Sequence, residues 1–169
     1  MYKRQQYQNA QVEAQRGFQA EIADIDRRMP VETAEERFGL NAEGISPEVK
    51  ANVEEGARRY EAVAGGATDA AAVTAWLKAG AAWKRAGNSE KAGSAFAAAH
   101  AIGTGGVVGW SAASQYAASL AEAGNADQAI VTLEAVRPLI SGLEAHQTDL
   151  TIAMLLSLIH ISEPTRLSA

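Results

Sequence analysis

The stretch Gly87-Asn88-Ser89-Glu90-Lys91-Ala92 recurs 37 residues later as Gly124-Asn125-Ala126-Asp127-Gln128-Ala129. Alanine-rich segments precede and follow both copies. Alanine is the best helix former, Gly suits a helix C-terminus that needs positive φ, and Asn can cap the following helix. Each copy therefore predicts a helix–turn–helix, and its repetition predicts a solenoid of stacked helix pairs.

The composition extends this prediction to the rest of the chain. Alanine is the most frequent of the 169 residues, and runs of β-branched or aromatic residues are rare. Further helix breaks are expected near Pro30, at 44–47, at Gly65-Gly66, at 103–109 and at Ser141-Gly142. We therefore predict an all-α fold: a truncated helix–turn–helix repeat solenoid with an N-terminal amphipathic helix.

Bulk properties exclude several classes of protein. The net charge of −5 without a basic stripe argues against nucleic acid as a partner. Without cysteine there is neither a disulfide scaffold nor a thiolate metal site. Outside the C-terminal end, no stretch approaches the roughly 20 apolar residues of a membrane span.

The N-terminal segment predicts helices with defined starts. One is expected from about Asn9 to Arg28, with an apolar seam formed by Phe18, Ile22, Ile25 and Met29. The seam fits a helix packed on its neighbour, or a coiled-coil stalk behind an upstream anchor. Thr33-Ala34-Glu35-Glu36 has the spacing of a capping box, and Ser46-Pro47 predicts a further helix start.

Both ends of the chain resemble translated sequencing-adapter DNA. Residues 2–5 (YKRQ) can be encoded as tat-aag-aga-cag, and the reverse complement of that string encodes Leu-Ser-Leu-Ile, the sequence of residues 156–159. The longer run 156–166 resembles a read through the adapter arm. We expect residues 1–5 and 156–169 to be adapter-derived and excluded from fold reasoning. Residues 6–155 would then be a fragment of a metagenomic gene cut at both ends.

The repeated stretch resembles the tetratricopeptide repeat (TPR) family, over about residues 46–155 and most closely over 69–138. The family's signature positions in the first copy are Trp76, Gly80, Trp83, Gly87, Ala92, Phe96 and Ala99. In the second copy they are Ala113, Ala117, Leu120, Gly124, Ala129, Leu133 and Val136. Upstream, Gly56, Tyr60 and Val63 fit the second helix of an earlier, degenerate copy. The chain would thus contain an N-terminal helical segment (6–45) and incomplete repeats (46–155).

The resemblance implies a concave groove lined by the first helix of each copy, which binds a protein or peptide. The groove positions would be Thr74, Leu77, Ala81, Lys84, Arg85, Ser111, Ser114 and Ala118, followed by Ala121. Lys84 and Arg85 would make one end basic, which suits an extended peptide with an acidic group. The Lys/Asn pattern that clamps a terminal carboxylate in some family members is absent.

Other motifs that suggest chemistry have simpler interpretations. The run 103–109 (GTGGVVG) lacks the preceding strand that a dinucleotide-binding turn needs, and we interpret it as an inter-repeat loop. His100 and His146 have no second ligand at metal spacing, and Trp76, Trp83 and Trp110 fit core packing better than a ligand site. We predict no catalytic residues, cofactor or metal, and hence no enzyme activity.

The sequence therefore predicts a scaffold for protein–protein interaction. Two alternatives stay open: a membrane-anchored, extracytoplasmic repeat protein whose N-terminal anchor is lost, and the accessory domain of an enzyme whose catalytic part is missing. Flanking sequence would distinguish them. A bacterial cytoplasmic location and a periplasmic one are equally compatible with the chain.

Overall fold

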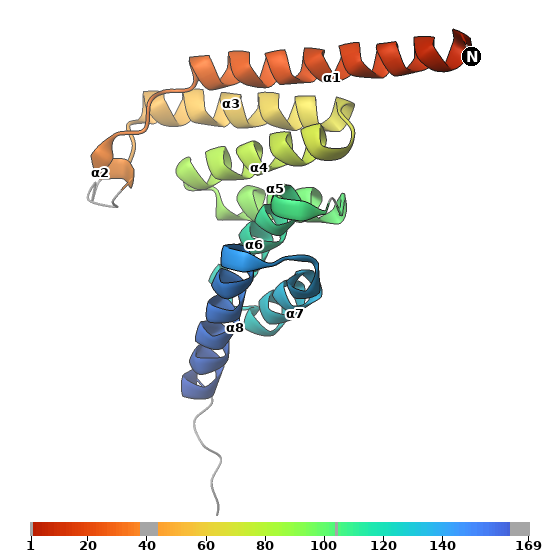
Figure 1. Cartoon of the computed structure of the whole chain (residues 1–169). Coiled ribbons are helices and arrows are strands. Elements are labelled where there is room, and N and C mark those ends of the chain that lie inside the picture. Colours follow the sequence, from red (N-terminus) through yellow and green to blue (C-terminus); the bar gives the residue numbers. More distant parts are fainter. Residues whose placement is uncertain (1, 38–43, 104, 163–169) are drawn as a thin grey trace, which may run out of the picture. The chain divides into compact units, whose positions relative to one another are not determined.

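The computed structural model describes residues 2–37, 44–103 and 105–162, and these residues form helices and no strand. The helices are α1 (Tyr2–Arg28), α2 (Ala34–Arg37), α3 (Pro47–Gly66), α4 (Asp69–Arg85), α5 (Ser89–Ala101), α6 (Gly106–Glu122), α7 (Ala126–Val136), the 3-10 helix η1 (Arg137–Leu139) and α8 (Gly142–Ser162) (Figure 1). They divide into an N-terminal unit, Met1–Ala95, and a C-terminal unit, Phe96–Ala169. The all-α class is confirmed for this part of the chain, whereas the TPR-like solenoid stays a prediction.

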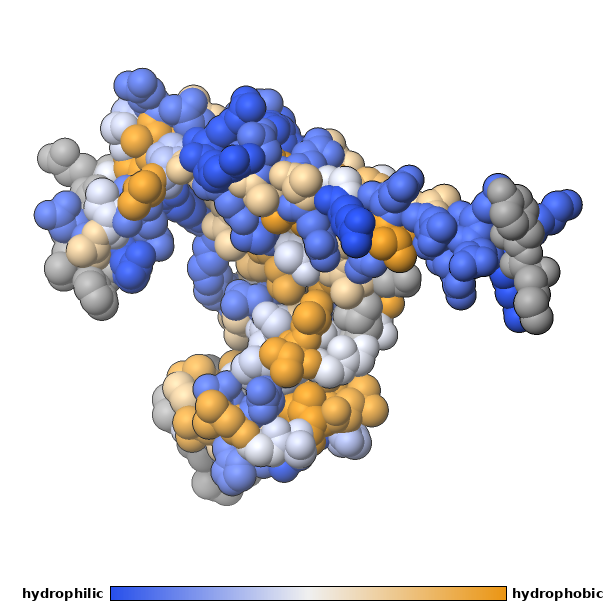
Figure 2. All heavy atoms as spheres, turned by 45° about the horizontal axis from the view of Figure 1, so that its top comes forward, coloured by the Kyte–Doolittle hydropathy of each residue, from blue (hydrophilic) through white to orange (hydrophobic). Residues whose placement is uncertain are grey.

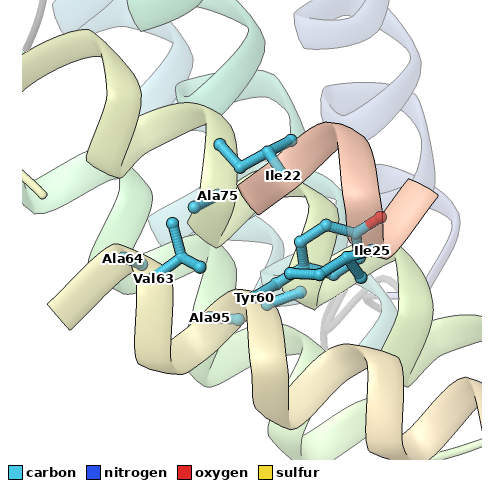
Figure 3. Close-up of a cluster of buried hydrophobic side chains, with 8 residues drawn as sticks. Ile22, Ile25, Tyr60, Val63, Ala64, Ala75 and Ala95 are labelled. Atoms are coloured by element: carbon cyan, nitrogen blue, oxygen red, sulfur yellow. The ribbon is translucent and has the colours of Figure 1, made fainter. Parts of the chain in front are cut away.

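In the N-terminal unit, α1, α3 and α4 pack side by side around one apolar cluster. Ile22 and Ile25 of α1 lie against Tyr60 and Val63 of α3 (Figure 3), and Phe18 and Met29 flank them. All four residues of the predicted seam therefore pack as a helix–helix contact. Residues 3–17 of α1 are exposed, and Figure 2 shows this free end as mostly hydrophilic.

Charged side chains join α1 to the same two helices. Asp24 accepts a hydrogen bond from Arg59 at 3.1 Å, and this bond, with the nearby charge of Arg28, holds the pKa of the Asp24 carboxyl below its usual value. Lys78 donates to both oxygens of Asp26, at 2.8 and 3.0 Å, and the Tyr60 hydroxyl donates to Asp26 as well. Burial raises the pKa of Asp26, but these two donors outweigh it and leave the pKa lowered. Burial and the bond to Asp26 raise the pKa of Tyr60 well above its usual value.

The two copies of the repeated stretch have the same backbone turn. In the first, the Gly87 amide donates to the Lys84 carbonyl at 3.0 Å, and the Asn88 amide donates to Trp83 at 2.9 Å. In the second, Gly124 donates to Ala121 at 3.0 Å, and Asn125 donates to Leu120 at 2.8 Å. Both glycines have positive φ, 79° and 83°, which is the C-terminal conformation the sequence predicts.

Most of the residues at the quoted repeat positions are buried or half-buried. The small residues Gly80, Ala92, Ala99, Ala117 and Ala129 are all buried. Among the larger ones, Trp83, Phe96 and Leu133 are buried, and Leu120 is half-buried. A Cβ on Gly56 of α3 would lie 2.1 Å from the sulfur of Met29, the residue that follows α1. Gly56 therefore marks a close contact between α3 and the Met29 side chain.

The C-terminal unit has its own apolar cluster. Ala117 of α6, Ala129, Ile130 and Leu133 of α7, and Leu155 of α8 form its buried part, and Ile159 packs partly against it. Several large apolar residues of this unit stay on the surface, among them Val131, Leu143, Leu150 and Met154. Figure 2 shows corresponding hydrophobic areas over these helices.

Three details differ from the sequence-based expectations. Helix α1 begins at Tyr2 rather than near Asn9, because the intervening Gln, Lys and Arg residues are good helix formers. Asn88 caps α5 through Lys91 N–H at 3.0 Å, but the Asn125 side chain makes no capping bond to α7. Residues 106–109, which were expected to belong to the inter-repeat loop, form the first turn of α6.

The other predicted helix starts are confirmed. Ser46 Oγ accepts a hydrogen bond from Val49 N–H at 3.3 Å, with Pro47 in the first turn of α3. Thr33 Oγ1 accepts from Glu36 N–H at 3.2 Å and so caps α2. The Glu36 carboxylate, however, bonds to Arg85 of α4. The expected end of this short helix, Gly39, lies outside the described residues.

Candidate functional site

The predicted groove positions on α4 differ in solvent exposure and in hydrogen-bond partners. Ala81 and Lys84 are exposed, whereas Thr74 and Leu77 are half-buried. The Thr74 hydroxyl donates to the Ala70 carbonyl within its own helix at 2.8 Å. Arg85 has only 14% of its side chain exposed, because it bonds to the segment that precedes α3. This end of α4 is therefore already covered by the chain itself.

Arg85 contacts that segment at three places. Its Nε donates to Glu36 Oε2 at 2.9 Å, its Nη1 to the Pro30 carbonyl at 2.6 Å and its Nη2 to the Val31 carbonyl at 3.3 Å. An open hollow of about 280 Å³ lies beside these contacts, and its lining includes Lys78 and Ala81. We call this arrangement of Arg85 and the adjoining hollow the Arg85 socket.

A larger groove lies in the C-terminal unit, between α6 and α8, with a volume of about 370 Å³. From α6 and α7 it is lined by Trp110, Ser114, Ala117, Ala118, Ala121 and Leu133, and from α8 by Gln147, Thr148, Leu150, Thr151 and Leu155. We call it the α6–α8 groove. Of the predicted positions on α6, Ser114, Ala118 and Ala121 line it and Ser111 does not.

Trp110 and Thr148 join the two helices that form the α6–α8 groove. The Trp110 indole N–H donates to Thr148 Oγ1 at 3.0 Å, and this hydroxyl donates in turn to the Glu144 carbonyl at 2.8 Å. Thr148 is buried, with 2% of its surface exposed. Its hydroxyl both accepts and donates a hydrogen bond, as is usual for a buried polar group. The indole is thereby fixed in orientation at one edge of the groove.

The lining of the α6–α8 groove is uncharged and mostly apolar. Its polar groups are the Ser114 and Thr151 hydroxyls and the Gln147 amide, in addition to the Trp110–Thr148 pair. Apolar walls with a few uncharged polar groups are typical of sites that bind an apolar group and orient it by hydrogen bonds. The two sites thus differ in chemistry: charged side chains of both signs line the Arg85 socket, and uncharged ones line this groove.

Sequence reasoning missed the part of this groove that α8 provides. Gln147, Leu150, Thr151 and Leu155 were not predicted, because groove positions were assigned only to the first two copies of the repeat. Trp110 was interpreted as a core residue. The signal for its role was its spacing, since Trp110, Ser114 and Ala121 share one face of α6 at helical periodicity.

The remaining motifs behave as structural elements. Trp83 is buried, its indole donates to Glu61 at 2.6 Å, and Lys91 lies 4.1 Å from the ring centroid. His100 stacks on Tyr116, and His146 Nδ1 lies 2.7 Å from the Gly142 carbonyl. Within the described residues, no group of three or more His, Asp or Glu side chains could hold a metal ion.

Of residues 103–109, only those before Gly106 lie between α5 and α6, and residues 106–109 form the first turn of α6; Gly103 and Gly106 have positive φ. A helix rather than a strand precedes the run, so the inter-repeat loop is shorter than expected; Thr104 lies outside the described residues.

Comparisons with family models, with curated proteins and with solved structures found no significant match to this chain. The resemblance to the TPR family thus rests on the quoted positions and their spacing. In the described part of the chain, every helix is too short or too polar to cross a membrane.

Proposed function

We propose that this protein is an interaction scaffold, a TPR-like helical repeat module that binds a protein or peptide in its α6–α8 groove. One observation carries the proposal. Ser114 and Ala118, chosen from the repeat register alone, line an open groove between α6 and α8. In the proposed repeat register, α6 and α8 are the first helices of successive copies, and the family resemblance implies a ligand there.

The lining of the groove indicates which ligand it would accept. An uncharged lining gives no compensation to a buried carboxylate or ammonium group, so burial of a charge there is costly. Apolar side chains would gain from contact with Trp110, Ala118 and Leu150, while Gln147 and Thr151 could bond to peptide groups of the ligand. We therefore propose an apolar anchor residue on the partner rather than the acidic group suggested by Lys84 and Arg85.

The proposal is tested by selecting ligands and then blocking the groove. A random-peptide display library is selected against the full chain, and labelled winners are titrated against variants by fluorescence anisotropy. Ala118→Arg places a long charged side chain in the groove from an exposed position, so folding is expected to be retained. Affinity should fall at least about tenfold, the equivalent of about 1.4 kcal/mol.

Ala135→Arg is the matched control, because Ala135 is exposed on α7 and does not line the groove. This variant should bind the selected peptides like the unmodified chain. Winners rich in apolar or aromatic residues would support the proposed ligand class. Peptides that bind Ala118→Arg as tightly as Ala135→Arg would refute the groove as the binding site.

A further inference from the structure

The segment held by the Arg85 socket resembles a bound peptide in its geometry. Residues 30–33 are non-helical, and Arg85 bonds to the carbonyls of two consecutive residues, Pro30 and Val31. Those bonds recognise backbone and place no demand on side chains. The third, to Glu36, recognises a carboxylate. One guanidinium thus recognises a non-helical stretch and a carboxylate in the short helix that follows it, a use for which its planar fork of donors is suited.

The burial of the pair indicates that the socket needs an acidic partner. The side chains of Arg85 and Glu36 are only 14% and 12% exposed. A partly buried guanidinium without a counterion is unfavourable, because its lost hydration is not replaced. Lys78 in the wall of the adjoining hollow is already paired with Asp26, so Arg85 is the cation that an incoming carboxylate would meet. If the segment moved away, another carboxylate would take the place of Glu36.

The same segment is attached weakly in other respects. The Val31 side chain is 89% exposed, so it contributes almost no apolar burial. Helix α2 comprises only four residues, and all of them except Glu36 are exposed. The hollow of about 280 Å³ beside the segment leaves room for a ligand that approaches before the segment has left. These features are typical of a surface segment that a ligand can displace, and not of a part of the hydrophobic core.

We propose that the Arg85 socket is a second peptide-binding site, for an acidic peptide, and that residues 30–36 occupy it as an internal competitor. An external peptide would displace them by offering two backbone carbonyls and a carboxylate in the same arrangement. A tethered segment acts at an effective concentration in the millimolar range. The unmodified chain therefore binds such peptides weakly, and loss of the Glu36 carboxylate unmasks the site. This site does not depend on the α6–α8 groove.

The test uses the full chain and a fluorescein-labelled peptide that copies residues 29–37 (MPVETAEER), measured by anisotropy. Glu36→Ala should bind this peptide at least about tenfold more tightly than the unmodified chain, because the internal competitor is weakened. Glu35→Ala, which removes an exposed carboxylate from the same helix, should bind like the unmodified chain. Adding Arg85→Gln to Glu36→Ala should abolish the gain. Equal binding by Glu36→Ala and Glu35→Ala, or a gain that survives Arg85→Gln, would overturn the proposal.

A second measurement covers the case in which Glu36→Ala unfolds. The chain contains no cysteine, so Val31→Cys gives one exposed site for a dye on the segment itself. Unlabelled peptide should lower the anisotropy of that dye in a saturable manner as the segment is released. An anisotropy that peptide leaves unchanged into the millimolar range would reject displacement. Ala118→Arg should respond to the peptide like the unmodified chain, which separates this site from the α6–α8 groove.

Discussion

The two copies of the repeated stretch share a backbone and differ in what surrounds it. Both turns have the same pair of hydrogen bonds and a glycine with nearly the same positive φ. The position four residues before the turn glycine differs between the copies. In the first copy it is Trp83, which is 1% exposed, and in the second it is Leu120, which is half-buried. The comparison shows that the Gly-Asn turn specifies local geometry, while the side chains fitted around it decide how much stability each copy gains.

The surfaces of the two copies differ in a related way. On α4, the Arg85 socket is covered by residues 30–36 and by Glu36 in particular. On α6, the equivalent face lines an open groove. One copy therefore presents a site that the chain fills itself, and the other presents a site that is open.

The largest expected difference in stability between the copies comes from replacing the large side chain four residues before each turn glycine. Trp83→Ala should lower the free energy of unfolding by about 3–5 kcal/mol, because it removes a buried ring and leaves a cavity. Leu120→Ala should cost less than about 2 kcal/mol, since the half-buried side chain loses less contact. Urea unfolding followed by far-UV circular dichroism measures both. Equal losses would show that the two positions are packed alike and would remove this contrast.

The small-residue positions should respond alike in both copies. Ala92→Leu and Ala129→Leu each insert a large side chain at a buried position, so each should cost about 1–3 kcal/mol through overpacking. Ala135→Leu, at an exposed position of α7, is the control and should change stability by less than about 0.5 kcal/mol. Thermal unfolding of the three variants provides the comparison. An unchanged melting temperature for Ala92→Leu would contradict the repeat register.

Sequence predicted local features better than long-range ones. The glycine turns, the Ser46 and Asn88 caps and the seam from Phe18 to Met29 each depend on residues a few positions apart, so their pattern was sufficient. The bond from Arg85 to Glu36 joins residues 49 apart and follows no period. The α8 wall of the groove depends on where that helix begins. The start of α8 at Gly142, with φ of 66°, agrees with the helix break expected there, but no groove position was assigned to this helix from the sequence.

The ends of the chain remain a separate proposal. Helix α8 continues past Leu155 to Ser162, and Ile159 packs partly against the cluster of the C-terminal unit. We still propose that residues 1–5 and 156–169 are adapter-derived, because that reasoning rests on codons and not on conformation. The residues that line the α6–α8 groove all precede residue 156. The groove therefore consists of positions that this proposal keeps as native.

The smallest expected difference in stability comes from replacing Asn88 and Asn125, the asparagines that follow the two turn glycines. Asn88 Oδ1 accepts from Lys91 N–H, whereas Asn125, at φ −97° and ψ 55°, makes no such bond to α7. Asn88→Ala should therefore cost about 1 kcal/mol, the usual value of a lost N-cap. Asn125→Ala should cost less than about 0.5 kcal/mol, as at other exposed positions. Urea titrations of both variants distinguish the two turns. Equal losses would mean that Asn125 also caps its helix in solution, and the two copies would then have the same turn in side chains as well as in backbone.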